Sequence, residues 1–310
     1  MPNLTIVVDC NDQNYAREIC EALQLFPEVT AVLPEHPAAR TAEYASCWFP
    51  DASLLTRSPA LKLIQAASAG VDHLPDSLFA SPVPLCRVVD EDFRHGMFEY
   101  ALWGVLWFQR NFDRALAHQS QRVWKIYPQR AAADFRIGVM GLGEIGGYIA
   151  TRLAGLGYHV SGWARSEKQL PGVRCYHGDA QAGEFFAELD ALINVLPLTE
   201  QTRGILARPL LDRLPTGAVL INCGRGEHMV NHDILQALDS GRLAGAVLDV
   251  FPVEPLPQDD PLWLHPQVVI TPHMASIAPA EVVARQLLEN IHRQQRALPL
   301  NNLVDKQRGY

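Results

Sequence analysis

Short runs of consecutive apolar residues recur along this chain, and they have the length of buried β-strands. The first run is residues 4–8, and similar runs follow at 45–49, 61–67 and 83–89. Residues 15–25 place apolar side chains at the spacing of an amphipathic helix. Because strands that alternate with helices are typical of a parallel sheet, the N-terminal part of the chain predicts an α/β domain.

Residues 97–119 form the longest stretch with a helical pattern. Tyr100, Trp103, Trp107 and the alanines between them make this stretch apolar on nearly every side. A helix that is apolar all round is typically buried. We therefore expect one long helix between two bodies, and we place the crossing into a second domain here.

A second series of strands and helices begins at residue 136. The predicted strands are residues 137–140, 159–163, 191–196, 218–222, 245–250 and 268–271. Such a series, with a glycine turn after its first strand, is typical of the doubly wound dinucleotide-binding fold. A final helix at 278–297 is expected to return the chain to the first domain.

The predicted fold class is therefore α/β, with two Rossmann-like doubly wound parallel-sheet domains and an interdomain cleft. Residues 1–98 and 280–310 are expected to form a flavodoxin-like substrate-binding domain. Residues 99–279 are expected to form the dinucleotide-binding Rossmann domain. A chain of 310 residues is long enough to bury a core in each domain.

The composition narrows the class of partner. Hydrophobic residues make up 48% of the chain and charged residues 19%, as in an ordinary globular protein. The formal net charge of −8 provides no positive field that would attract nucleic acid or an anionic membrane. The longest apolar run, residues 101–108, is far shorter than the roughly 20 residues of a membrane-spanning helix. We expect neither nucleic acid nor a membrane as a partner.

Cysteine and histidine spacing gives no sign of a metal site. The six cysteines are Cys10, Cys20, Cys47, Cys86, Cys175 and Cys223, and they form no Cys-x-x-Cys pair. His228 and His232 are four residues apart but lack a third ligand nearby. Met1-Pro2-Asn3 leads directly into a predicted strand without a signal-peptide pattern. We expect a cytoplasmic protein with reduced, mostly buried cysteines and no metal.

A glycine-rich turn follows the predicted strand at 137–140. Its residues are Gly141, Leu142, Gly143, Glu144, Ile145 and Gly146, and helix-forming residues follow at 148–156. In this context the first glycine allows a tight turn, the second lets a pyrophosphate approach the backbone, and the third lets the helix pack against the strand. The helix N-terminus adds free N–H groups for the phosphates. The turn predicts a dinucleotide site.

The turn after the next strand bears on which dinucleotide binds. NAD sites usually carry an Asp or Glu there to accept from the ribose 2′-hydroxyl. This chain has Ala164, followed by Arg165, Ser166 and Lys168. Cationic and hydroxyl groups suit a 2′-phosphate, which a carboxylate would repel. We expect NADP(H) to be preferred and NAD(H) to remain possible, with Glu167 as the opposing charge.

Three polar residues follow predicted strands at the edge of the sheet that carries the glycine turn. Arg225 follows the strand at 218–222, Glu254 follows the strand at 245–250, and His273 follows the strand at 268–271. Ligands of open α/β sheets bind beyond the carboxyl ends of the strands. Arginine can bind a carboxylate, and a histidine beside a glutamate can donate a proton. These three residues are the candidate catalytic set.

Several motifs, in this order along the chain, carry a resemblance to a known family. They are Ser68-Ala-Gly-Val-Asp72, the glycine turn, Leu196-Pro-Leu-Thr-Glu-Gln-Thr202, Asn222-Cys-Gly-Arg-Gly226, Asp249-Val-Phe-Pro-Val-Glu-Pro255 and Thr271-Pro-His273. With them the chain resembles the D-isomer-specific 2-hydroxyacid dehydrogenases over nearly its whole length. The Trp163-Ala-Arg-Ser turn, Glu99-Tyr100 and the terminal Arg308-Gly-Tyr310 are most similar to the bacterial glyoxylate/hydroxypyruvate reductases of that family.

The resemblance implies roles for further residues. Backbone N–H groups of Ala69, Gly70 and Val71 would bind the substrate carboxylate, together with Arg225. Asp249 would accept from the nicotinamide carboxamide. The loops along the cofactor would include Pro197, Thr202, Cys223 and Gly224. Trp48 ends a predicted strand, where it would either cap a small substrate or pack in the core.

The function expected from residues and resemblance together is reduction of small 2-keto acids with NADPH. Glyoxylate would give glycolate and hydroxypyruvate would give glycerate, with His273 as proton donor. One alternative is a reductase of a bulkier 2-keto acid. The other is a non-catalytic dinucleotide-sensing protein, similar to the corepressors of this family. The resemblance also implies a homodimer, to which the apolar residues 101–108 would contribute or in which they would only join the domains.

Overall fold

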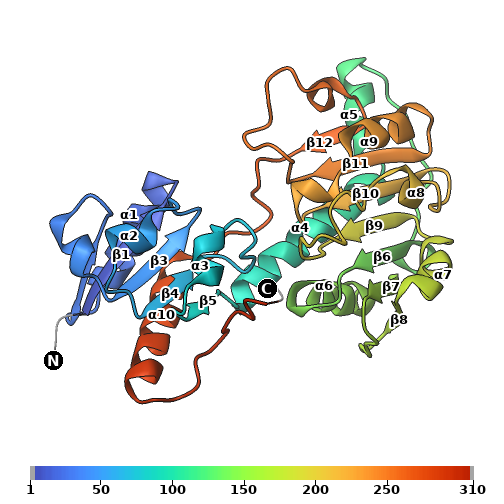
Figure 1. Ribbon diagram of the computed structural model, residues 1–310. Coiled ribbons are helices and arrows are strands. Elements are labelled where there is room, and N and C mark those ends of the chain that lie inside the picture. The colour runs from blue at the N-terminus through green and yellow to red at the C-terminus, as the bar shows by residue number, and fades with distance from the viewer. Residues whose placement is uncertain (1–3, 308–310) are drawn as a thin grey trace. The chain divides into compact units, whose positions relative to one another are not determined.

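The computed structural model describes residues 4–307. The N-terminal Met1-Pro2-Asn3 and the C-terminal Arg308-Gly-Tyr310, both used above, lie outside these residues. The chain divides into two compact units, Met1–Phe93 with Ile277–Tyr310 and Arg94–Ser276 (Figure 1). The predicted domain boundaries, after residues 98 and 279, lie a few residues beyond the observed ones, which follow Phe93 and Ser276. The roles predicted for the two domains stay predictions. The prediction of two parallel α/β sheets is confirmed.

The first unit contains a five-stranded parallel sheet in the order β2-β1-β3-β4-β5. Its strands are β1 Leu4–Cys10, β2 Val29–Val32, β3 Tyr44–Trp48, β4 Leu63–Ala66 and β5 Leu85–Cys86. This is the strand order of flavodoxin-like folds. Loops that follow β3 and β4 therefore lie at one edge of the sheet.

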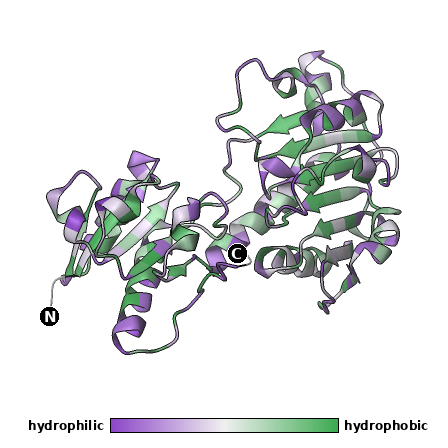
Figure 2. Ribbon diagram, viewed as in Figure 1, coloured by the Kyte–Doolittle hydropathy of each residue, from purple (hydrophilic) through white to green (hydrophobic). Residues whose placement is uncertain are grey.

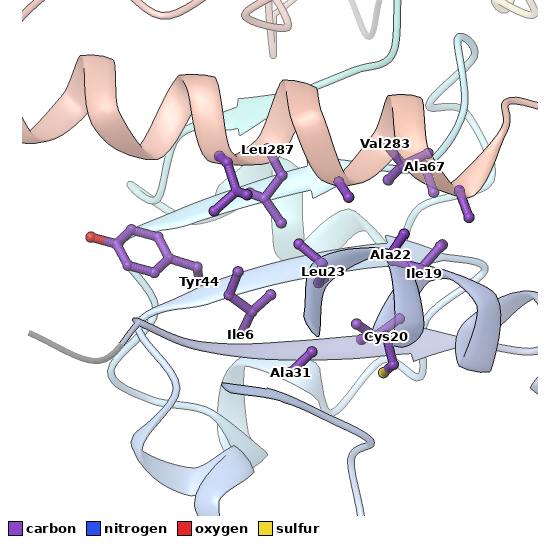
Figure 3. Close-up of a cluster of buried hydrophobic side chains, with 14 of the residues drawn as sticks. Ile6, Ile19, Cys20, Ala22, Leu23, Ala31, Tyr44, Ala67, Val283 and Leu287 are labelled. Atoms are coloured by element: carbon purple, nitrogen blue, oxygen red, sulfur yellow. The ribbon is translucent and has the colours of Figure 1, made fainter. Parts of the chain in front are cut away.

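Both faces of this sheet are covered, which explains why its strands are apolar throughout. Helices α1 (Gln13–Gln24) and α10 (Ala280–Gln295) pack against alternate residues of β1, among them Ile6, as Figure 3 shows. Val7 points to the other face, where helix α2 (Leu54–Arg57) and helix α3 (Asp76–Ala80) contribute to a second cluster. The C-terminal helix thus completes a core that the N-terminal residues begin.

The second unit contains a seven-stranded parallel sheet in the order β12-β11-β10-β9-β6-β7-β8. Its strands are β6 Arg136–Met140, β7 His159–Ala164, β8 Val173–His177, β9 Ala191–Asn194, β10 Ala218–Asn222, β11 Leu243–Leu248 and β12 Val268–Ile270. The strand order reverses between β6 and β9. Because ligands of doubly wound sheets bind at such a reversal, beyond the carboxyl ends, the glycine turn after β6 lies where a dinucleotide is expected.

The helices of the second unit cover this sheet on both sides. They are α4 Glu91–Gln109, α5 Phe112–Ser120, α6 Glu144–Gly155, α7 Ala182–Phe186, α8 Arg208–Leu211 and α9 Asn231–Asp239. Short 3₁₀ helices are η1 Pro37–Thr41 in the first unit and η2 Ala132–Asp134, η3 Asp179–Gln181, η4 Gly226–His228 and η5 Pro261–Leu264 in the second. Helix α4 approaches the sheet closely because Gly104 leaves room for Ile221. The strands are largely hydrophobic and the helices mixed, as Figure 2 shows.

The prediction of one long, buried helix at 97–119 is wrong in two respects. The structure has two helices, because Asn111 adopts a left-handed backbone (φ 56°) that ends α4 and starts α5. Asparagine tolerates this conformation better than most residues, so the sequence contained a signal. No residue of α5 is buried, so the expected burial holds only for part of α4.

Two strands were missed, β2 and β8. Strand β8 is at the edge of its sheet and has a partly exposed, mixed pattern with Arg174 and His177, so it lacks an apolar run. Strand β2 is also an edge strand and has only four residues. The prediction that the cysteines are mostly buried is confirmed, since five of the six are buried and Cys175 is half-buried. Within residues 4–307 no helix is both long and apolar enough to cross a membrane.

Candidate active site

The glycine turn after β6 has the shape that a pyrophosphate requires. Gly141 has a positive φ of 98°, and a Cβ there would lie 2.9 Å from the carbonyl oxygen of Val195. A Cβ at Gly146 would lie 1.7 Å from the carbonyl oxygen of Gly141, so only glycine fits. Around Gly143, in contrast, nothing lies within 4 Å of an added Cβ, which leaves the backbone open at the start of α6. These residues fit a bound dinucleotide.

The other residues of this turn differ in their surroundings. Leu142 is buried and its side chain covers Gly162 of β7, so it anchors the turn. Ile145 is half-buried and Glu144 is exposed. The Glu144 carboxylate lies 3.3 Å from the guanidinium of Arg94, which offsets its negative charge near the expected phosphates.

The turn after β7 lies directly beside the glycine turn. The Gly141 N–H donates to the carbonyl oxygen of Trp163 over 2.9 Å. Ala164, the next residue, is buried and carries no carboxylate. The residues that follow it are exposed; these are Arg165, Ser166, Glu167 and Lys168. Three of these four side chains suit a phosphate group.

The loop after β9 is organised by Thr202. Its hydroxyl donates to the Pro197 carbonyl oxygen over 2.8 Å and accepts from the Thr199 N–H over 2.8 Å. After β10, Cys223 is buried and burial raises the pKa of its thiol, so the thiol stays neutral. A Cβ at Gly224 would lie 2.9 Å from the Asn194 amide nitrogen, so this position also excludes a side chain.

His273 and Glu254 form a close pair. The Nδ1 atom of His273 lies 2.8 Å from Oε2 of Glu254, and the Phe251 N–H donates to Oε1 over 2.8 Å. Burial by itself would raise the pKa of Glu254. The hydrogen bonds from His273 and Phe251 and the positive charges of His273 and Arg225 outweigh it, so the pKa lies below its ordinary 4.5. The carboxylate is therefore ionised and orients the imidazole.

Arg225 belongs to the same electrostatic group, because its charge contributes to the lowered pKa of Glu254. Its backbone is extended directly after β10, and its Nη1 donates to the Gly224 carbonyl oxygen over 2.7 Å. The next residue, Gly226, touches the backbone of Phe251, where a Cβ would lie 1.9 Å from the carbonyl carbon. The structure thus brings together the three residues predicted as catalytic.

Asp249 is buried at the end of β11 and holds the segment that carries His273. Its Oδ1 accepts from the Thr271 hydroxyl over 2.5 Å and from the Met274 N–H over 2.9 Å, and its Oδ2 accepts from the Ala275 N–H over 2.9 Å. His273 itself has a left-handed backbone (φ 52°). This anchoring was not predicted, and the role of Asp249 toward a carboxamide stays a prediction.

Tyr100 extends this anchor. Its hydroxyl lies 2.6 Å from the Thr271 hydroxyl. Since Thr271 donates to Asp249, Tyr100 must be the donor to Thr271. Burial raises the pKa of Tyr100, so the hydroxyl keeps its proton. The sequence offered only a weak signal for this contact, since the two residues are far apart along the chain.

The predicted carboxylate-binding turn lies in the first unit, after β4. The Ser68 hydroxyl donates to the Gly70 carbonyl oxygen over 2.8 Å, and Arg87 donates to the Ala69 carbonyl oxygen over 3.1 Å. Within residues 4–307, the backbone N–H groups of Gly70 and Val71 form no hydrogen bond. The turn is therefore held through its carbonyl groups while these donors remain available.

Trp48 ends β3 and is partly buried against the core of the first unit. Its ring meets the ring of Tyr15 edge-on, with centroids 5.6 Å apart. It also contacts Phe49, which has a left-handed backbone (φ 47°). Core packing is thus observed, and a contact with substrate stays a prediction.

The two histidines with ligand-like spacing do not converge. His228 is fully buried and contacts Asn194, whereas His232 contacts Gln236. In the described part of the chain, no group of three or more His, Cys, Asp or Glu residues is placed to hold a metal ion.

Comparison with known proteins finds a matching family model and similar proteins. The model of the D-isomer specific 2-hydroxyacid dehydrogenase NAD-binding domain matches residues 102–275. Glyoxylate/hydroxypyruvate reductase A from Klebsiella pneumoniae (strain 342) is 41% identical over 276 residues, which cover 87% of this chain and 88% of that protein.

Two solved structures are similar over almost the whole chain. One is a D-isomer specific 2-hydroxyacid dehydrogenase family protein from Klebsiella pneumoniae 342, with 76% identity, a TM-score of 0.96 and coverage of 99% of both chains. The other is the NADPH-dependent glyoxylate/hydroxypyruvate reductase from Sinorhizobium meliloti in complex with NADP and sulfate. It has 35% identity and a TM-score of 0.90, and the match covers 99% of this chain and 100% of that chain.

Proposed function

This chain belongs to the D-isomer specific 2-hydroxyacid dehydrogenase family, and we propose that it reduces small 2-keto acids with NADPH. Glyoxylate and hydroxypyruvate are the proposed substrates, and glycolate and glycerate the products. The observation that carries the proposal is the His273–Glu254 pair beside Arg225, at the edge of the sheet that bears the glycine turn.

The reaction needs a hydride at the carbonyl carbon and a proton at the carbonyl oxygen. A bound reduced nicotinamide supplies the hydride. Nδ1 of His273 is occupied by Glu254, so the proton for the oxygen comes from Nε2. The C=O bond becomes a C–OH bond, and the imidazolium becomes a neutral imidazole.

Glu254 orients His273 for this step. The pKa of Glu254 lies below its ordinary 4.5, so the carboxylate is ionised at working pH, binds Nδ1 and leaves Nε2 for the carbonyl oxygen. Since this pKa is depressed in the folded state, the stability that it contributes is present above 4.5 and is lost as the pH falls through the folded value.

The substrate carboxylate requires donors that do not lose their protons. A guanidinium keeps its charge at working pH, and that of Arg225 offers a fork of N–H groups. We assign the carboxylate to Arg225. A contact with the backbone N–H groups of Gly70 and Val71, which belong to the first unit, stays a prediction of the resemblance. Arg225 also favours the negative charge that develops on the carbonyl oxygen.

The preference for NADPH rests on the turn after β7. Ala164 is followed by Arg165, Ser166 and Lys168, all exposed beside the glycine turn. The similar reductase from Sinorhizobium meliloti is NADPH-dependent and was solved with NADP. We propose that these side chains bind the 2′-phosphate.

Arg165→Asp is expected to lower the NADPH-to-NADH ratio of kcat/KM by about ten- to a hundredfold, because a charged hydrogen bond to the phosphate is replaced by repulsion. The measurement is steady-state kinetics with each cofactor. Arg213→Asp makes the same change of charge at another exposed position of this unit and should leave the ratio unchanged. An unaltered ratio in Arg165→Asp would remove this turn from cofactor selection.

The activity itself is tested by oxidation of NADPH, and separately of NADH, with glyoxylate, hydroxypyruvate, pyruvate and a branched 2-keto acid. The range is needed because Klebsiella pneumoniae 342 has both the reductase at 41% identity and the family protein at 76% identity. Fast turnover of the two small oxygenated acids with NADPH supports the proposal. Turnover of the branched acid alone indicates a bulkier substrate, and dinucleotide binding without turnover indicates a sensor.

We also propose that the chain forms a homodimer through an apolar surface of the second unit. This surface comprises Phe112, Leu116, Val123, Trp124 and Ile126, with 95% of Trp124 and 84% of Ile126 exposed. Large exposed apolar side chains that recur within one short stretch, here residues 112–126, are typical of a protein–protein contact. The surface belongs to α5 and the segment after it and lies outside residues 101–108, whose part in a dimer or in joining the domains stays a prediction.

Trp124→Asp is expected to shift the chain from dimer to monomer, because it replaces the most exposed side chain of this surface by a charge. Light scattering after size exclusion should give twice 34.4 kDa for the parent and 34.4 kDa for the variant. Leu25→Asp changes a single exposed leucine of the first unit, 77% exposed, and should remain dimeric. A dimeric Trp124→Asp would place the contact elsewhere.

A further inference from the structure

We propose that His228 is a positioning residue that fixes the backbone of Arg225 on one side and the Pro197 loop on the other, and that it does so as a neutral imidazole. The link to substrate binding rests on the proposed function, in which Arg225 holds the 2-keto acid. The structural part of the inference does not depend on that function.

His228 is the last residue of η4 and is completely buried. A buried polar ring requires partners for both of its nitrogens. Its Nδ1 lies 2.9 Å from the side-chain nitrogen of Asn194 and 3.3 Å from the backbone nitrogen of Arg225. Both partners are N–H donors, so Nδ1 must be an acceptor without a proton.

The other nitrogen of the ring faces an acceptor. Nε2 of His228 lies 3.3 Å from the carbonyl oxygen of Pro197. A carbonyl oxygen can only accept, so Nε2 carries the single proton of the ring. The contacts thus select one tautomer, and a second proton on Nδ1 would face two donors.

Two asparagines complete the network around the ring. Asn194, at the end of β9, donates to the Asn222 side-chain oxygen over 2.9 Å and accepts from the Leu196 N–H over 3.4 Å. This pattern confirms which end of the Asn194 amide faces His228. We call Asn194, Asn222 and His228 the Asn/His network.

Arg225 is held by this network at both of its backbone groups. The N–H donates to His228, and the carbonyl oxygen accepts from the Asn222 side chain over 3.2 Å. Asn222 and Asn194 are also fully buried. The side chain of Arg225 is long and flexible, so its guanidinium is placed accurately only if the backbone of the residue is fixed. The network fixes that backbone and thereby positions the guanidinium for substrate.

The network also explains Gly224. A Cβ there would lie 2.9 Å from the Asn194 amide nitrogen and 3.3 Å from Nδ1 of His228. A side chain at this position would separate the partners of the ring. The turn therefore combines a glycine that leaves room for the network with an arginine that the network holds.

Two substitutions of His228 separate its two contacts. An asparagine oxygen can take the place of Nδ1, and a glutamine nitrogen can take the place of Nε2. His228→Asn should keep the acceptor for Arg225 and lose the donor to Pro197. His228→Gln should keep the donor and lose the acceptor.

Steady-state kinetics should show this separation. We expect His228→Gln to raise KM for glyoxylate by about tenfold, as for one lost buried hydrogen bond, with a smaller change for NADPH. We expect His228→Asn to raise KM for NADPH more than KM for glyoxylate. His232→Asn, which changes the neighbouring histidine outside the network, should match the parent. Equal changes of both KM values in both variants would indicate only a structural role and would overturn the proposal.

A readout without substrate separates this inference from the proposed function. Amide exchange of Arg225 should be about tenfold faster in His228→Gln than in the parent and near the parent rate in His228→Asn. Unchanged exchange in His228→Gln overturns the inference. Absence of 2-keto acid turnover in the parent overturns only the proposed function.

The parent chain alone provides a second test, should a variant fold poorly. In ¹⁵N-histidine-labelled protein, the buried ring should appear as a neutral imidazole with its proton on Nε2. A ring with the proton on Nδ1, or a doubly protonated ring, would contradict the contacts to Asn194 and Arg225. The inference would then be wrong.

Discussion

Replacement of Arg225 by methionine is expected to lower kcat/KM for glyoxylate by about a thousandfold, the effect of removing a charged group from the site where charge develops. Methionine keeps much of the side-chain length and removes the donors. The backbone contacts of Arg225 to His228 and Asn222 do not depend on its side chain, so the turn should keep its conformation. Affinity for NADPH, measured by fluorescence titration, should change little.

Arg225→Lys distinguishes charge from geometry. Lysine keeps the positive charge but cannot form the bidentate fork that guanidinium makes with a carboxylate. We therefore expect Arg225→Lys to have a kcat/KM for glyoxylate between that of the parent and that of Arg225→Met. Most of the decrease should come from a higher KM for the keto acid. If lysine restores full activity, only the charge is needed and the assignment of a bidentate contact is wrong.

Arg213→Met is the matched control for this experiment. It removes a guanidinium from an exposed position of the same unit, so any general effect of net charge appears in it as well. Parent-like kinetics for Arg213→Met, together with a large loss for Arg225→Met, assign the effect to the site. Wild-type turnover by Arg225→Met would mean that the carboxylate binds elsewhere.

The sheets could be predicted from the sequence because of their burial. Strands covered on both faces are apolar at every position, and such runs identified β1 and β10, for example. Strand β8 has no such run, since an edge strand exposes much of its surface. The break at Asn111 depends on one backbone conformation, which an overall apolar composition does not reveal.

The site could be predicted to a similar degree. The positions of Arg225, Glu254 and His273 follow from the rule that ligands bind beyond the carboxyl ends of parallel strands. The pairing of Glu254 with His273 was expected and is observed. The hydrogen bonds that hold these three residues in place could not be predicted from any local pattern. They form the Tyr100–Thr271–Asp249 chain and the Asn/His network, which join residues that are distant in the sequence.

The hydrogen bonds of Asp249 fix the backbone of the turn that carries His273. Asp249 accepts from the backbone N–H groups of Met274 and Ala275, and its own carbonyl oxygen accepts from the His273 N–H over 2.8 Å. The histidine therefore sits in a turn that is fixed on both sides, with a left-handed backbone. Its side chain can be changed while the turn remains, provided that the new residue tolerates this conformation.

His273→Ala is expected to lower kcat by about a thousandfold, within the usual contribution of a positioned general acid, while NADPH still binds. The second substitution, His273→Asn, isolates the proton. Asparagine tolerates a positive φ, and its amide nitrogen can take the place of Nδ1 and donate to Glu254. It has no group in the place of Nε2, so we expect the same loss of kcat.

Turnover in D₂O gives the sharper test of His273. In the parent, kcat should be lower in D₂O because Nε2 transfers a proton in the transition state, and this isotope effect should be smaller in both variants, which lack a positioned donor. His159→Asn, at an exposed position of the same unit, should keep the parent isotope effect. If His273→Asn retains both the rate and the isotope effect, the proton comes from a different group. Glu254 would then serve only to hold the turn, and the carboxylate contacts of Arg225 would be the part of the mechanism that survives.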